Sequence, residues 1–162
     1  MTNWTDILFK TFWCGWAAVG FGILFNVPRK TLFTIWTGGA IAGFIKFTVL
    51  FLSTGSPVIR ASFFSALAVG IFSIPVANRR REPPMIFAIP SVISLVPGTF
   101  AYRTMFGLIK LAGNIGNGYA GTLSETVHNG VATLFIIMAI AIGVAIPAHV
   151  IQTNGIAKIA KN

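Results

Sequence analysis

The chain has 162 residues and a formal net charge of +9, and 55% of its residues are hydrophobic while only 9% are charged. Because a soluble domain carries about 25% charged residues, this composition excludes a water-soluble globular protein and makes lipid the main solvent. The basic residues stand in short clusters between apolar runs, which argues against nucleic acid as a partner. The single cysteine, Cys14, lies in an apolar run, so we expect no intrachain disulfide and no thiolate metal cluster.

Five apolar stretches follow one another along the chain. Since a transmembrane helix needs about 20 largely apolar residues, we predict an all-α integral membrane protein with a single transmembrane domain over residues 1–162. The predicted spans cover about residues 7–27, 31–52, 61–77, 85–112 and 123–151. The sharpest boundary follows the third span, where three arginines precede Glu82, Pro83 and Pro84, because proline cannot continue a helix.

The Lys and Arg residues near the span ends predict an orientation, because cytoplasmic loops retain positive charge during insertion. Seven of them fall on one side: Arg29, Lys30, Arg79, Arg80, Arg81, Lys158 and Lys161. Three fall on the other side: Lys10, Arg60 and Lys110. This bias places the N-terminus outside the cell and the C-terminus in the cytoplasm.

Small residues recur four positions apart in three of the spans. They are Gly39 and Gly43, then Ser62, Ala66 and Gly70, and finally Ala139 and Gly143. Small residues at this spacing let helix backbones approach closely in lipid. These faces therefore predict tight packing among the helices of this chain or against a partner.

The fourth stretch is interrupted by Pro90 and by the segment Pro97-Gly98-Thr99. An unpaired backbone group costs several kcal/mol in lipid, so a break at this depth requires surrounding protein or a water-filled cavity. A helix that restarts at Gly98 or Thr99 would direct free N–H groups and the positive end of its dipole into that cavity, where they suit a carboxylate. Broken helices of this kind line many transporter sites, whereas the simpler alternative is a proline kink.

Two cations accompany the break. Lys46 lies within the second span, roughly 10 Å from its outer end, so its ammonium either snorkels to the interface or has a functional role. Arg103 lies a little over one turn beyond the break and either anchors the outer end of the span or faces the same cavity. Its proximity to Gly98 favours the cavity.

The ionisable residues give little basis for an enzyme. Glu125 and His128 share a helix face that suits a metal or a proton relay, but Thr122 and Glu125 also match a capping box at the start of the fifth span. The chain has no H-E-x-x-H motif, no G-x-S-x-G elbow and no Walker loop. We therefore expect no enzymatic activity, no cofactor and no metal site, which leaves transport or structural association.

Several of these segments together resemble the threonine/serine exporter family. The resemblance is carried by Phe25-Asn26-Val27-Pro28 with Arg29, by Ile89-Pro90 leading through Val96-Pro97-Gly98 to Tyr102, by Asn129, and by Ile146-Pro147. It covers nearly the whole chain. More narrowly, the chain resembles the short, separately encoded subunit of that family, the type that includes the small subunit of a bacterial succinate exporter. In that family one long protein, or a long and a short subunit together, forms a ten-helix exporter.

The resemblance implies the small subunit of a two-part exporter of carboxylate-bearing metabolites in the bacterial cytoplasmic (inner) membrane. Its expected partner is a larger membrane subunit of the same family, related to this half by an inverted-topology repeat, with the substrate between the halves. The expected substrate contacts are Pro97, Gly98, Thr99, Tyr102, Arg103, Lys46 and Asn129, with Glu125 and His128 as candidates for proton coupling. The alternatives are a structural or assembly subunit without substrate contacts and a small channel-forming oligomer.

Overall fold

The structure is a computed structural model that describes residues 4–52, 58–113 and 119–159, with the side chains of the last helix described as far as His149. Within these ranges every regular element is a helix. The elements are α1 (Trp4–Leu24), the short 3₁₀ helix η1 (Arg29–Thr31), α2 (Leu32–Leu52), α3 (Val58–Arg80), α4 (Met85–Ile93), α5 (Gly98–Gly113) and α6 (Tyr119–Ile159). Four helices are individually long and apolar enough to cross a membrane, and counting the bent pair α4–α5 as one span gives five. The predicted all-α fold with a broken fourth span is confirmed.

Two helices end in caps that the span prediction did not include. α1 and α3 are each followed by a residue in the left-handed region, Asn26 with φ 54° and Arg81 with φ 57°. The next N–H in each case donates to a carbonyl five positions back, at 3.0 and 3.2 Å, which is the Schellman arrangement. α3 therefore runs past its predicted end at residue 77 to Arg80, because arginine favours helix and its charge suits a helix C-terminus.

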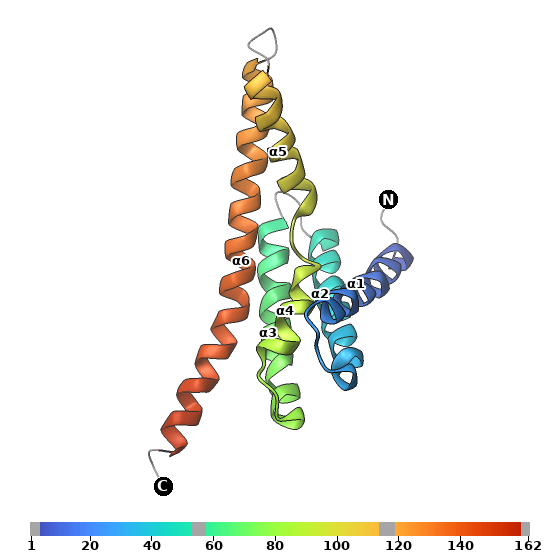
Figure 1. The fold of residues 1–162 in the computed structure, drawn as a ribbon, viewed down its shortest axis with the longest axis vertical. Helices are drawn as coiled ribbons and strands as arrows, with labels where there is room; N and C mark the ends of the chain where they lie inside the picture. The colour runs from blue at the N-terminus through green and yellow to red at the C-terminus, as the bar shows by residue number, and fades with distance from the viewer. Residues whose placement is uncertain (1–3, 53–57, 114–118, 160–162) are drawn as a thin grey trace.

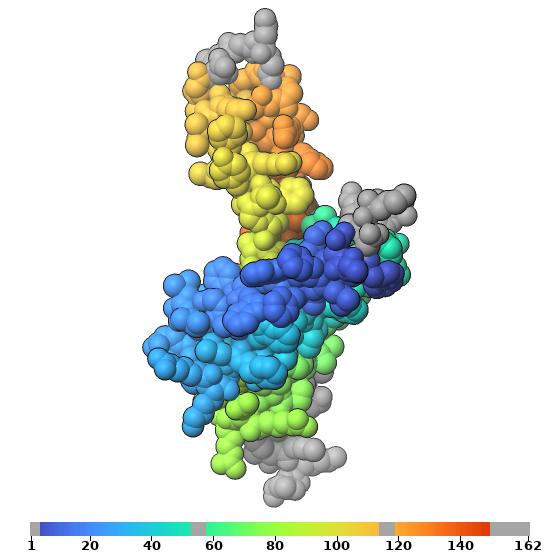
Figure 2. All heavy atoms as spheres, turned by 90° about the vertical axis from the view of Figure 1, so that its right-hand side faces the viewer, coloured from blue at the N-terminus to red at the C-terminus, as the bar shows by residue number. Residues whose placement is uncertain are grey.

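α6 is the longest element, about 60 Å at 1.5 Å per residue, and it connects two parts of the fold (Figure 1). Its carboxyl half packs against α3, where Gly143 lies against Ala66, and its amino half packs against α5, where Gly107 lies against Thr126. α5 and residues 119–127 of α6 project beyond the other helices, and we call this pair the arm (Figures 1 and 2). From His128 onward α6 shares a cavity with Val58 and Ile59 at the start of α3.

Helices α1 to α4 form a body beside the carboxyl half of α6. α1 lies across α2 (Figure 2), and α4 contacts α1, α2 and α3. The main apolar core joins α2, α3, the α4 region and α6 through Ala42, Ala66, Val69, Ala88, Val92, Leu95, Ile136 and Ile140. Leu95 lies in the break and is only 1% exposed, so the break is inside the body.

The predicted small-residue faces are confirmed as helix contacts. Gly39 and Gly43 on α2 both lie against Cys14 of α1, and a Cβ on Gly39 would come 2.9 Å from the Cys14 carbonyl oxygen. A Cβ on Gly143 of α6 would come 2.9 Å from the Phe63 carbonyl oxygen of α3. Because backbone atoms cannot rotate away as a side chain can, glycine is what permits these close approaches.

Some of the sequence predictions lie outside the described residues. They are the turn at residues 53–57, Lys161 and the side chain of Lys158, and the charges of both lysines enter the predicted orientation. The other basic residues of the predicted cytoplasmic side belong to η1 and to the end of α3. These two places lie toward the same end of the molecule as the carboxyl end of α6 (Figure 1).

Candidate functional site

The break between α4 and α5 comprises residues 94–97 and bends the span by 59°. It separates two helices with their own ends, so it is a true interruption rather than a kink within one helix. Pro97 is buried, whereas Gly98 and Thr99 at the start of α5 are exposed. α5 begins at Gly98, so the helix restarts where the sequence predicts.

Lys46 reaches the break from α2. Its Nζ donates a hydrogen bond to the Leu95 carbonyl oxygen at 3.0 Å, although the two residues are 49 positions apart in the chain. This carbonyl follows the last residue of α4, where unpaired carbonyls form the negative end of the helix dipole. The ammonium therefore lies at the carboxyl end of α4 inside the body instead of extending along α2 to the membrane interface.

The amino end of α5 supplies hydrogen-bond donors on the other side of the break. The first N–H groups of any helix lack a partner within it. In α5 the N–H of Gly98 donates to the Val96 carbonyl oxygen at 2.9 Å. Within the described part of the chain, the N–H groups of Thr99 and Phe100 have no such bond. The free donors therefore begin one position after the restart.

Ser91 fixes the buried side of α4 to α2. Its hydroxyl lies 2.8 Å from the Phe87 carbonyl oxygen of its own helix and 3.3 Å from the Ile35 carbonyl oxygen of α2. Gly38 faces this hydroxyl so closely that a Cβ would collide with it. The close approach of α2 to α4 at Gly38 brings Lys46, about two turns farther along α2, to the break.

Three buried hydroxyls have no hydrogen-bond partner within the described residues: Thr11 on α1, Thr48 on α2 and Ser62 on α3. Thr48 and Ser62 each lie four residues from the facing ends of α2 and α3, so they share one depth in the body. Thr11 contacts Gly43, close to one turn before Lys46. Buried polar atoms normally have partners, so these hydroxyls offer hydrogen bonds to water or a polar ligand near the level of Lys46.

Arg103 and Tyr102 lie on the exposed surface of α5. Tyr102 is 68% exposed and stacks on Phe106 with ring centroids 6.0 Å apart. Among the described residues no hydrogen bond or ion pair is formed by Arg103. The fold therefore brings Lys46 to the break, while Arg103 and Tyr102 stay on a surface that this chain does not cover.

The three predicted residues of α6 have different surroundings. Asn129 is only 4% exposed, and it lies one turn from Thr126 on the face that packs against α5. His128 lines a cavity of about 270 Å³ together with Phe100 of α5. Glu125 is exposed, and no third His, Cys, Asp or Glu of the described residues joins this pair to form a metal-ligand group.

The capping box proposed for Thr122 and Glu125 is wrong. α6 is already helical at Tyr119, so Thr122 is the fourth residue of the helix, and its carbonyl accepts a hydrogen bond from the Thr126 hydroxyl at 2.6 Å. A capping residue must precede the first helical residue and have a non-helical backbone. Sequence spacing alone did not distinguish a helix start from the helix interior.

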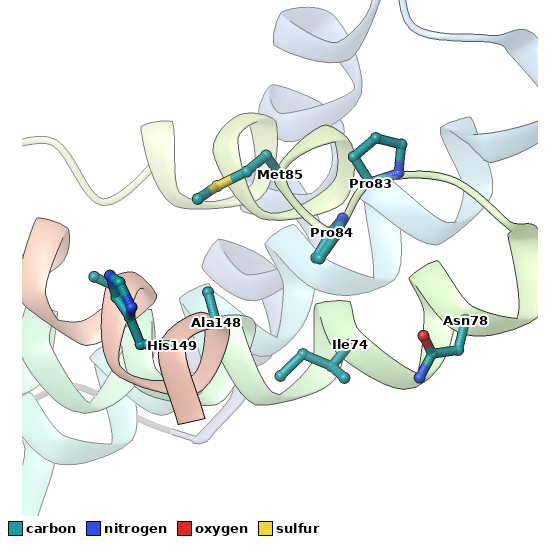
Figure 3. A pocket seen from close by; sticks show the side chains of 8 residues that line it. Ile74, Asn78, Pro83, Pro84, Met85, Ala148 and His149 are labelled. Atoms are coloured by element: carbon teal, nitrogen blue, oxygen red, sulfur yellow. The ribbon is translucent and has the colours of Figure 1, made fainter. Parts of the chain in front are cut away.

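A larger cavity lies at the other end of α4 (Figure 3). Its volume is about 480 Å³, and it lies between the end of α3, the start of α4 and α6. Asn78 and His149 are its polar lining residues, and Pro83, Pro84 and Met85 form much of one wall (Figure 3). The cavity lies at the end of the body that the charge pattern assigns to the cytoplasm.

Comparison with known proteins places this architecture in a family. The family profile described as "Threonine/Serine exporter, ThrE" matches residues 10–150. The chain belongs to the threonine/serine exporter family. With four to five apolar helices long enough to span a membrane among the described residues, and with this membership, the chain is a multi-pass membrane protein of an exporter family, and the break and Lys46 both lie within the matched part.

This chain is also similar to a longer protein. It is 29% identical over 142 residues to an uncharacterized protein of Haemophilus influenzae, and the alignment covers 87% of this chain and 46% of the relative. The chain therefore spans about half the length of that relative. No solved structure matches this exporter family chain.

Sequence reasoning missed the residues that position Lys46. Gly38 and Ser91 set the distance between α2 and α4, and Leu95 accepts the hydrogen bond through its backbone. The one available signal was the pair of hydroxyls, Ser91 and Ser94, in an otherwise apolar run. A backbone acceptor such as Leu95 leaves no mark in the sequence.

Proposed function

We propose that this chain is the small subunit of a two-part secondary exporter that moves small carboxylate-bearing metabolites, such as threonine, serine or succinate, out of the cell. The observation that carries the proposal is the contact of Lys46 with the broken span α4–α5 inside a member of an exporter family. Broken helices provide the substrate and ion sites of many secondary transporters, because their ends expose backbone groups within the membrane.

The two sides of the break suit a carboxylate. The free N–H groups of Thr99 and Phe100 lie at the positive end of α5, and Lys46 adds a full charge beside the break. Pro97 directly precedes the first residue of α5, and a Cβ on Gly98 would meet no atom within 4 Å, so there is open space beside these N–H groups. Each charge-assisted hydrogen bond to a carboxylate is worth roughly 1.5–3 kcal/mol.

Four further residues are proposed for roles that depend on closure by a partner. Tyr102 and Arg103 are exposed on α5, so they contact the substrate only if a second subunit encloses this surface. Asn129 supplies a buried amide between α5 and α6. His128, beside a cavity, remains a candidate for proton coupling together with Glu125.

The arm is the proposed docking surface for the larger membrane subunit of the same family. α3 alone is about 35 Å long and spans a bilayer core of about 30 Å, yet the arm extends beyond it by nine residues of α6, about 14 Å. Large apolar side chains remain exposed along it: Tyr102, Met105, Phe106, Leu108, Ile109, Leu123 and Val127. A surface of this kind outside the bilayer is expected to be covered by protein.

A partner of matching size is consistent with the relative, more than half of which lies outside the matched part. If that partner carries a related five-span unit, the odd number of spans requires the two halves to have opposite orientations, as in an inverted repeat. The substrate would then lie between the break of this chain and the partner.

We further propose that the chain lies in the bacterial cytoplasmic membrane with its N-terminus outside and its C-terminus in the cytoplasm. Reporter fusions test this orientation. A reporter after Asn162 should be active as a cytoplasmic fusion, and one inserted within residues 53–57 as an external fusion. Finding both reporters on one side would contradict the five-span arrangement.

Efflux from loaded cells tests the function. Cells that express this chain alone, the larger subunit alone, or both together are loaded with threonine, serine or succinate, and the release of each is followed. We expect efflux of at least one of them only when both subunits are present. Full transport by the purified chain in liposomes would favour the channel alternative, and no efflux with any pair would favour an assembly subunit.

Gly98→Leu sharpens the assignment of the site, and Gly113→Leu on the same helix is its control. A Cβ at either position meets no atom within 4 Å, so both variants should fold and assemble. Leucine at position 98 covers the free N–H groups of α5, so we expect efflux to fall about tenfold or more. Equal efflux from the two variants would remove the amino end of α5 from the substrate site.

A further inference from the structure

Lys46 neutralises a helix end that other transporters fill with an ion. The lysine lies six residues from the end of α2, about 9 Å, and Leu95 is 1% exposed. Carbonyl groups at the carboxyl ends of broken helices commonly coordinate a coupling cation such as Na⁺. Here a side chain of another helix brings the positive charge to the carbonyl oxygen at 3.0 Å.

The surroundings of Lys46 provide few competing polar partners. Cys14 of α1 lies against Gly43, three residues before Lys46, and Thr11 lies one turn from Cys14 on the same helix with a hydroxyl that has no partner within the described residues. A cation removed from water needs an acceptor. The acceptor it has here, the neutral Leu95 carbonyl, is weaker than a carboxylate, because ionised acceptors form shorter and stronger hydrogen bonds.

We propose that Lys46 is a tethered counter-cation of α4, and that its ammonium leaves the Leu95 carbonyl when a substrate carboxylate enters. Substrate binding then releases the carboxyl end of α4, and the break becomes the moving part of the site. This inference rests on the proposed function, because it requires a carboxylate at the break. It adds that occupancy of the site changes the conformation of residues 94–97, which lie at the 59° bend between α4 and α5.

Chemical rescue tests the role of the ammonium. In the two-subunit complex, Lys46→Ala should lower efflux by about ten- to a hundredfold, and added methylammonium should restore part of it by binding at the vacated position. Lys10→Ala is the matched control, because Lys10 is exposed on α1 and its Nζ lies over the Phe47 ring, 5.6 Å from the centroid, without a hydrogen bond to a residue of the break. Loss of efflux without rescue by methylammonium, or unchanged efflux, would overturn the proposal.

Hydrogen exchange separates this proposal from the proposed function. In the unaltered complex, substrate should slow hydrogen exchange of the Thr99 and Phe100 amides, and this slowing reports carboxylate binding. Substrate should also speed hydrogen exchange in residues 94–98, and this acceleration reports their release by Lys46. Lys46→Ala should exchange rapidly in residues 94–98 even without substrate. If substrate protects Thr99 and Phe100 but leaves residues 94–98 unchanged, the inference fails while the site stands. If neither segment responds, the proposed site fails.

The hydrogen-exchange measurement on the unaltered complex still tests the proposal if the Lys46→Ala complex does not assemble. It needs no substitution and therefore does not depend on the folding of a variant. Substrate-dependent exchange at residues 94–98 would support the proposal, and its absence beside clear protection of Thr99 would overturn it.

Discussion

The two halves of α6 are both apolar but lie in different surroundings. In the carboxyl half Gly143, Ala139 and Ile140 are buried against the body, and a Cβ on Gly143 would touch the backbone of α3. In the amino half α5 is the neighbour, and side chains such as Leu123 and Val127 are exposed. Apolar composition therefore does not distinguish the two halves, and the close backbone approach at Gly143 marks the half that packs against the body.

The same contrast separates the two sides of the break. α4 is enclosed by other helices and held through Ser91, whereas α5 contacts mainly α6, packs on the core through Phe100 and exposes most of its remaining surface. A substrate site between them combines a fixed side and an open side. A second subunit can bind on the open side, which α5 forms. The predictions below test this difference between α4 and α5.

Gly143→Leu should have the largest effect. The new side chain would begin 2.9 Å from the Phe63 carbonyl oxygen and 3.1 Å from the Leu67 nitrogen, so α3 and α6 must separate. We expect the free energy of unfolding to fall by about 3 kcal/mol or more, measured as a lower thermal midpoint of the purified chain in detergent.

Gly121→Leu on the amino half of α6 is the matched control for this variant. A Cβ at Gly121 meets nothing within 4 Å, so the free energy of unfolding of the isolated chain should stay within about 0.5 kcal/mol of the unaltered value. If the two leucines destabilise the chain equally, the halves of α6 are not packed differently.

Arg103→Ala should lower efflux by about ten- to a hundredfold, because a bidentate hydrogen-bond donor to the carboxylate is lost. Arg103→Lys should restore only part of the efflux, since lysine lacks the planar fork. The exposed position of Arg103 predicts that neither change affects the stability of the isolated chain. Efflux is measured in cells whose membranes contain normal amounts of the complex, and normal transport by Arg103→Ala would make Arg103 an interfacial anchor.

Truncating the exposed side chains of α5 should give the smallest of the predicted effects. Tyr102, Met105 and Ile109 are 68%, 61% and 65% exposed and lie at helical spacing on one side of α5. Their combined change to alanine should leave the isolated chain as stable as before and weaken capture of the larger subunit by about tenfold. Co-purification at a series of detergent concentrations measures this, and undiminished capture would place the partner elsewhere.

The sequence by itself determined the spans, the restart of the helix at Gly98 and the contact faces around Gly39 and Gly143. Each of these signals is local. Apolar length decides whether a helix can cross lipid, proline removes a helical donor at its own position, and a glycine permits close approach wherever its helix meets another. Such properties belong to neighbouring residues and can be read without knowing the fold.

Only the tertiary structure decided that Lys46 meets Leu95 and that the arm leaves the body. The first depends on the register of α2 against α4, which Gly38 and Ser91 set, and it joins residues 49 positions apart through a backbone atom. The second depends on where α3 begins beside α6. Neither register is encoded in the local sequence, because side-chain packing between helices fixes the alignment of their axes only after all of them have formed.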